Sequence, residues 1–115
     1  MDHPEYAFLS GKEMLHQTLQ STAWLKEMFH PLHLAFAFPF SDKGVGSDFF
    51  HSLGFDSKPI IDVSFGTAGI KKEQLNRHKQ RIPLEGYNLS AGSVIFSEYL
   101  YYLLKMPFGK NIIYR

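Results

Sequence analysis

Six histidines are the residues of this chain whose chemistry best suits a metal ion. Only His30 and His33 lie close together, and Pro31 between them breaks the helical spacing that would bring two rings to one face. The sequence contains no H-E-x-x-H motif, and no pair of carboxylates lies beside these two residues. We therefore expect five of the histidines to be surface or packing residues, namely His16, His30, His33, His51 and His78.

Nucleophilic and nucleotide chemistry find little support in the sequence. The chain has no cysteine, which excludes a cysteine nucleophile, Cys-ligated zinc, iron–sulfur clusters and disulfides. No G-x-S-x-G motif marks a nucleophilic serine. Gly44-Val45-Gly46 is part of a dinucleotide fingerprint, but no strand–turn–helix pattern surrounds it. The basic residues 71–79 are interpreted as a solvated segment, with contact to an anionic partner as the alternative.

The charge balance and hydropathy pattern argue against two classes of partner. Twelve Lys and Arg residues against eleven Asp and Glu residues give a net charge of +1, which offers no electrostatic reason to expect nucleic acid. No window approaches the roughly 18 uninterrupted apolar residues of a membrane span, so we expect none. The first residues lack the basic and apolar pattern of a signal peptide, and the cellular compartment stays open.

Three helices are expected to position these residues. Ser10 and Glu13 have the spacing of a capping box, which starts a helix that ends at about Phe29. A short helix is predicted at residues 48–53. A third helix, at residues 90–105, is apolar around most of its circumference and needs cover on more than one side. With 11 Phe, 6 Tyr and 1 Trp, the chain has either a large core or a surface that another molecule covers.

Three short apolar runs are predicted to be strands: residues 34–38, 59–65 and 80–84. Side chains alternate along a strand, so Phe36 and Phe38 should share one face of the first run. The apolar character of these runs predicts strands that are covered on both faces, as in parallel sheets. Strands that alternate with helices indicate an α/β fold with a mostly parallel sheet, and the length of 115 residues is typical of one domain.

Several segments occur in a characteristic order and spacing. They are His3-Pro4 with the later Leu9-Ser10, the run F-A-F-P-F-S at residues 36–41, the passage from Leu53-Gly54-Phe55 to G-T-A-G at residues 66–69, and Gln80-Arg81-Ile82-Pro83. In this combination, from His3 to about Leu104, the chain resembles the C-terminal portion of the polysaccharide deacetylase family, the chitin-deacetylase-like carbohydrate esterases.

The resemblance implies both a fold and a reaction. Family members are distorted (β/α) barrels, so residues 1–115 would be a single partial domain, the C-terminal part of a polysaccharide-deacetylase-like barrel. Family enzymes hydrolyse N-acetyl groups on amino-sugar polysaccharides with a divalent, zinc-like metal held by one Asp and two His. His3 matches the second histidine of the family motif H-[S/T]-x-x-H-P and would be a metal ligand.

The resemblance also assigns roles to residues at strand ends. Pro39 and Phe40 would shape the substrate groove, and Arg81 would orient the catalytic Asp. The residues leave alternatives open: core packing for Phe40 and a strand-end salt bridge for Arg81. The chain departs from the family at Ser41, where a glycine is usual, and at residues 103–105, where Leu-Leu-Lys stands in place of a Leu-x-His motif.

The family's Asp-Asp pair and the first histidine of its motif have no counterpart in this sequence. A lone histidine does not hold a zinc-type ion in a catalytic geometry, so we expect this chain alone to bind no metal and to be inactive. A partial barrel exposes strand edges, which predicts self-association or pairing with a companion fragment. The alternative function is a non-catalytic α/β module that binds carbohydrate or protein through its aromatic surface.

Overall fold

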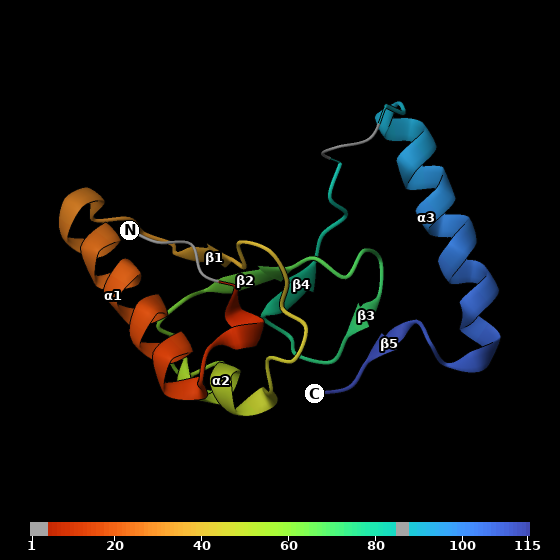
Figure 1. Ribbon diagram of the computed structural model, residues 1–115. Coiled ribbons are helices and arrows are strands. Elements are labelled where there is room, and N and C mark those ends of the chain that lie inside the picture. The colour runs from red at the N-terminus through yellow and green to blue at the C-terminus, as the bar shows by residue number, and fades with distance from the viewer. Residues whose placement is uncertain (1–4, 85–87) are drawn as a thin grey trace.

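The structure is a computed structural model that describes residues 5–84 and 88–115. Figure 1 shows two regions: a small sheet flanked by two helices, and a long third helix that stands to one side. The elements in chain order are η1 (Tyr6–Phe8), α1 (Gly11–Phe29), β1 (Ala35–Ala37), α2 (Ser47–Ser52), β2 (Val63–Gly66), β3 (Lys72–Glu73), β4 (His78–Gln80), α3 (Ala91–Lys105), η2 (Met106–Phe108) and β5 (Ile112–Ile113).

The strands β1, β2 and β4 form a three-stranded sheet with β2 in the centre. Both pairings are parallel, as predicted, and the register aligns Phe36 with Ser64 and Ser64 with His78. These three side chains therefore share one face of the sheet. β3 and β5 form a separate two-stranded parallel sheet. Among the described residues no barrel closes, and the partial barrel stays a prediction.

One face of the three-stranded sheet carries the core. Phe36 and Phe38 share this face, as predicted, with ring centroids 5.0 Å apart. Phe38 is fully buried, together with side chains of η1, α1, α2 and the loops that follow α2: Tyr6, Met14, Phe49, Phe50, Leu53, Phe55 and Ile61. On the other face Ala35 and Ala37 are exposed. The prediction of strands covered on both faces is wrong for the described residues, because α1 and α2 pack together on one side.

α1 begins and ends where its sequence predicts. The Glu13 backbone N–H donates to Ser10 Oγ at 3.4 Å, and the Ser10 N–H donates to Glu13 Oε2 at 2.8 Å, which completes the capping box. His30 ends the helix in a left-handed conformation with φ 48°. Inside the fold the Thr18 and Tyr6 hydroxyls form a buried hydrogen bond of 2.8 Å, which joins η1 to α1.

Two strand boundaries and one interpretation of the sequence are wrong. The second strand starts at Val63 rather than residue 59, and the last strand of the sheet covers His78–Gln80 rather than residues 80–84. Residues 71–79, interpreted as a solvated segment, contain β3 and the fully buried His78. The local sequence could not reveal this, because the partners that make burial of His78 possible come from distant segments.

α3 contacts the rest of the chain sparsely. Val94 is its one buried residue in the part of the chain that the structure describes, whereas Phe96 is 70% and Leu104 66% exposed. The Tyr102 hydroxyl donates to the Ala68 carbonyl oxygen at 3.0 Å. The described residues therefore do not supply the cover that this helix was expected to need. Neither α3 nor any other described helix has the length and hydropathy needed to cross a membrane.

Candidate functional site

The carboxyl ends of the parallel strands bring together three of the predicted site residues. Pro39 and Phe40 follow β1, and Arg81 follows β4. Ligand sites of open parallel sheets typically form at this edge. Arg81 Nη2 donates to the Phe38 carbonyl oxygen at 2.8 Å, which fixes Arg81 beside the Pro39–Phe40 segment. The fourth predicted residue, His3, lies outside the described residues.

The surroundings of these residues bear on the open alternatives. Phe40 is 59% exposed, so the core-packing alternative for Phe40 is wrong. Arg81 forms no ion pair with any residue in the ranges 5–84 and 88–115, and its backbone pairs with Gly66 and Gly69, both at 3.2 Å. The roles that the resemblance assigns to Pro39, Phe40 and Arg81 stay predictions.

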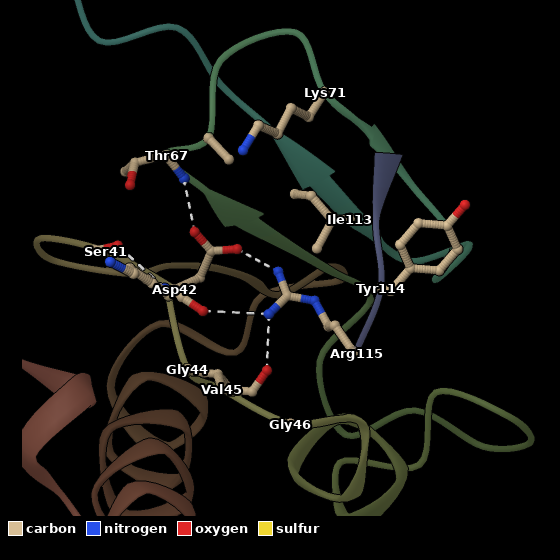
Figure 2. A pocket seen from close by; sticks show the side chains of 12 residues that line it. Ser41, Asp42, Gly44, Val45, Gly46, Thr67, Lys71, Ile113, Tyr114 and Arg115 are labelled. Atoms are coloured by element: carbon tan, nitrogen blue, oxygen red, sulfur yellow. Dashed lines mark hydrogen bonds and ion pairs between the residues drawn. The ribbon is translucent and has the colours of Figure 1, made fainter. Parts of the chain in front are cut away.

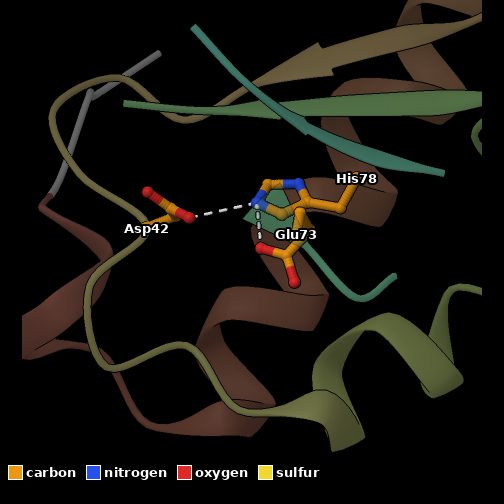
Figure 3. Close-up of side chains that lie close together, drawn as sticks. All are labelled: Asp42, Glu73 and His78. Carbon is orange, nitrogen blue, oxygen red and sulfur yellow. Dashed lines mark hydrogen bonds and ion pairs between the residues drawn. The ribbon is translucent and has the colours of Figure 1, made fainter. Parts of the chain in front are cut away.

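Six polar side chains near the same edge of the sheet are connected by hydrogen bonds, and we call them the polar cluster. They are Asp42, Ser64, Glu73, His78, Gln80 and Arg115. His78 connects two of its members, because Nδ1 lies 2.7 Å from Ser64 Oγ and Nε2 lies 3.0 Å from Asp42 Oδ2. An ionised carboxylate only accepts, so the His78 Nε2–H is the donor of the hydrogen bond to Asp42. Figure 3 shows the imidazole edge directed at the two carboxylates.

Arg115 supplies the positive charge of the polar cluster. Its guanidinium donates to the carboxylates of Asp42 and Glu73, and the Nε–Oε2 distance to Glu73 is 3.1 Å. Nη1 also donates to the carbonyl oxygens of Asp42 at 3.2 Å and Val45 at 2.8 Å, as Figure 2 shows. The guanidinium carbon lies 5.0 Å from the Phe50 ring centroid, within cation–π range. Arg115 follows β5 and is positioned by the pairing of β5 with β3.

Gln80 completes the polar cluster. Its Oε1 accepts from the Ala68 N–H at 2.8 Å, which directs Nε2 to Asp42 Oδ2 at 2.9 Å and Glu73 Oε2 at 3.2 Å. Gly66 leaves the space that this arrangement needs, since a Cβ there would collide with the Asp42 carboxylate and the Gln80 amide. Among the described residues no buried side-chain nitrogen or oxygen lacks a partner. The polar cluster is therefore internally satisfied.

The environment lowers the pKa of Asp42 well below its usual range. Burial by itself would raise this pKa, because it penalises the charged form. Hydrogen bonds from His78, Gln80, the Thr67 N–H and Arg115 favour the ionised form more strongly. Asp42 therefore stays charged over the whole neutral and mildly acidic range.

The polar cluster does not fit a divalent metal. Asp42, Glu73 and His78 offer ligand atoms that all lie within 4.8 Å of one another. The guanidinium of Arg115 and the amide of Gln80 already donate to the carboxylate oxygens that would face the ion. A metal needs these lone pairs, so it could enter only if both donors moved away. The zinc-like site that the resemblance implies is not built from these residues.

The series Ser64–His78–Asp42 has the order of a nucleophile, a base and an orienting acid. Ser64 and His78 are both 0% exposed, and the rings of Phe38 and Phe50 lie against the imidazole with centroids 5.7 and 4.7 Å away. A substrate carbonyl cannot reach a serine buried in the central strand. The series therefore holds the sheet and the Asp42 loop together instead of acting on a substrate.

The sequence predicts site residues at the strand ends, but its motifs do not predict the polar cluster. Asp42 and His78 are 36 residues apart, and Asp42 and Arg115 are 73 apart. One signal was available, because Asp42 directly follows the F-A-F-P-F-S run, at the strand end where polar side chains gather in parallel sheets. Arg115 carries no comparable signal.

Comparisons of the chain with protein-family models, with curated proteins and with solved structures find no match. The functional proposal therefore depends on the geometry of the strand ends and on the exposed surfaces.

Proposed function

We propose that this chain is the C-terminal part of a polysaccharide-deacetylase-like domain, and that Pro39, Phe40 and Arg81 bind an amino-sugar polysaccharide. The hydrogen bond from Arg81 Nη2 to the Phe38 carbonyl oxygen, 2.8 Å long, is the observation that supports this most strongly. It joins two segments 43 residues apart, and the resemblance assigns both segments to one site.

The chemistry of these side chains suits a sugar. Phe40 is 59% exposed and offers an apolar ring face on which a pyranose can stack. A guanidinium has five N–H donors, and Arg81 uses one of them in the hydrogen bond to the Phe38 carbonyl oxygen. The remaining donors can reach hydroxyl or amide oxygens of a carbohydrate. An apolar face beside a few directed polar groups is the usual composition of a ligand site.

The chain alone should not carry out the family reaction. In a family domain the divalent metal generates hydroxide and polarises the N-acetyl carbonyl. Here His3 is the single residue that the resemblance assigns to that metal, and the polar cluster is occupied by Arg115. Incubation of the purified chain with chitin oligomers and zinc, cobalt or nickel should release no acetate above a metal blank. A rate that His3→Ala abolishes would contradict this expectation.

Binding is the direct test of the proposed site. Isothermal titration with a chitin oligomer should give a measurable Kd, and Phe40→Ala should weaken it roughly tenfold, equivalent to about 1.4 kcal/mol. Phe8→Ala is the matched control, because Phe8 is 83% exposed and belongs to η1. Equal affinities for both variants, or no binding by the unmodified chain, would show that the site is wrong.

The exposed surface of α3 favours a second function, association with protein. Phe96 is 70%, Leu104 66% and, in η2, Phe108 75% exposed. Apolar surface of this extent on one helix is typical of an interface. We propose that a second copy of this chain or a companion fragment covers it.

Sedimentation velocity over a roughly hundredfold range of protein concentration tests this second function. If the chain associates, its sedimentation coefficient should increase with concentration through mass action. Leu104→Glu should shift the chain toward the monomer. Leu32→Glu, which changes a leucine that is 94% exposed in the segment between α1 and β1, should not. A single monomeric species at every concentration would rule out a second copy of this chain as the partner.

A further inference from the structure

A pocket of about 520 Å³ lies beside the strand ends. Its walls are the loop at residues 41–46 after β1, residues 67–68 after β2, Lys71 and residues 113–115. Figure 2 shows these segments surrounding one open space. Its volume falls within the range of about 300–1,000 Å³ that is usual for small-molecule sites. The pocket continues the proposed carbohydrate site, because Thr67 Oγ1 donates to the Phe40 carbonyl oxygen at 3.0 Å.

Lys71 gives the pocket a free positive charge. Its side chain is half-buried, and its ammonium forms neither a hydrogen bond nor an ion pair with the residues that the structure describes. Figure 2 shows this side chain reaching from its own loop toward the Thr67 end of the pocket. A lysine ammonium that lines a pocket without a carboxylate partner favours an anionic ligand, which can form a charge-assisted hydrogen bond with it.

The acidic residue of the pocket does not repel such a ligand. The side chain of Asp42 is 3% exposed and receives hydrogen bonds from Arg115, His78 and Gln80. Its charge is therefore covered and matched on the interior side. Lys43, which is exposed at the rim, adds a second positive charge.

Hydroxyl and backbone groups make the remaining walls suitable for a sugar ring. Ser41 Oγ accepts from the Lys43 N–H at 3.1 Å, so its own proton is available to a ligand. Thr67 Oγ1 donates to Phe40 and keeps lone pairs that can accept. Gly44 has φ 82°, and a Cβ there would meet nothing within 4 Å, so the loop presents bare backbone.

We propose that this pocket binds a sugar unit that carries a carboxylate, of the uronic acid type, within the polysaccharide. Lys71 pairs with the carboxylate, while Ser41 and Thr67 exchange hydrogen bonds with ring hydroxyls. One lysine ammonium matches a single negative charge better than the charge of about −2 on a phosphate. The proposal rests on the proposed carbohydrate-binding function and specifies its ligand as an amino-sugar polysaccharide that also contains acidic sugar units.

The experiment compares two oligosaccharides of equal length by isothermal titration: an oligoglucuronate and the same oligomer with its carboxylates reduced to alcohols. The chain should bind the oligoglucuronate more tightly. Lys71→Gln should weaken that binding at least roughly tenfold, as expected when a charge-assisted hydrogen bond is lost, and should leave the reduced oligomer unaffected. Lys58→Gln, which changes an exposed lysine that does not line the pocket, should alter neither Kd.

Three outcomes would overturn the inference. They are equal affinities for the two oligomers, equal effects of Lys71→Gln and Lys58→Gln, or displacement of the oligoglucuronate by an equal concentration of inorganic phosphate, which would indicate a small-anion site. If chitin oligomers still bind through Phe40 in any of these cases, only the acidic ligand is wrong. If no oligosaccharide binds at all, the proposed function fails with it.

Discussion

The sheet region and α3 use the same kinds of residues in opposite ways. In the sheet region Phe38 and Phe50 are completely buried, and the rings of Phe49 and Phe50 meet nearly at right angles with centroids 5.3 Å apart. In α3 and η2, Phe96 and Phe108 lie mostly in solvent. Both regions contain several aromatic residues, but only the sheet region has opposing elements for them to pack against.

The difference shows what aromatic content can and cannot decide. Burial of apolar side chains is favourable, but it occurs only where a second element provides an opposing surface. α1 and α2 both pack on one face of the sheet. α3 lies apart from that sheet, so its apolar face and the opposite sheet face with Ala35 and Ala37 are both exposed. Stability should therefore be concentrated in the sheet region.

The largest expected contrast comes from truncating one phenylalanine in each region. Phe38→Ala leaves a cavity in a fully buried site and should lower the free energy of unfolding by about 3–5 kcal/mol. Phe96→Ala removes an exposed ring and should change it by less than about 0.5 kcal/mol. Urea denaturation at a concentration where the chain is monomeric measures both. Equal losses would mean that α3 is as well packed as the sheet.

Removal of a positive charge from each region should give a comparable contrast. Arg115→Met leaves the Asp42 and Glu73 carboxylates buried without their cation and should cost about 3–5 kcal/mol of stability. Lys105→Met in α3 removes an exposed contact with the Tyr101 ring, 3.8 Å from the ammonium, and should cost at most about 1 kcal/mol. A loss below 1 kcal/mol for Arg115→Met would show that the polar cluster contributes little.

Acid should weaken the sheet region through Asp42. In the unfolded chain this carboxyl takes up a proton near its ordinary pKa of about 3.9, whereas the lowered pKa in the fold keeps it ionised. Below about pH 4 the unfolded state therefore binds more protons than the folded state. The free energy of unfolding decreases as the pH is lowered, by up to about 1.4 kcal/mol per pH unit. Asp42→Asn should have a shallower slope in that window when the free energy of unfolding is measured against pH. Parallel slopes would contradict the assignment.

The smallest effect should come from the serine caps of the two long helices. Ser10→Ala removes the cap of α1, which packs on the sheet, and should cost about 1 kcal/mol. Ser90→Ala removes the cap of α3, whose side-chain oxygen accepts from the Ser93 N–H at 3.2 Å. That loss should destabilise only α3 and leave the main unfolding transition unchanged. A larger shift for Ser90→Ala would place α3 in the cooperative unit.

The features that the sequence predicted well are local ones. Ser10 and Glu13 are three residues apart, and Phe36 and Phe38 are two apart, so caps and strand alternation depend on short spacings. The burial of His78 depends on Asp42, which is 36 residues away, and no local pattern encodes that distance. For the same reason an apparently basic, solvated segment proved to contain the most buried histidine of the described residues.

The candidate site divides in the same way. Pro39, Phe40 and Arg81 could be proposed as site residues because they lie within motifs of a few residues, and their positions at strand ends follow from the parallel sheet. Arg115 was not identified, since its role depends on β5 returning to β3. The pattern of a single sequence does not show which distant segments pair with one another in the fold.

The contact between Asp42 and Arg115 also has a consequence for biosynthesis. The two residues are 73 positions apart, and ribosomes add about 5–20 residues per second, so Arg115 is made roughly 4–15 s after Asp42. Once β4 has also been made, β1, β2 and β4 can pair, but until Arg115 follows, the carboxylates of Asp42 and Glu73 next to the core have no guanidinium. The two carboxylates should therefore stay hydrated, and the sheet should not pack tightly. The protease sensitivity of ribosome-bound chains should decrease only after Arg115 has left the exit tunnel.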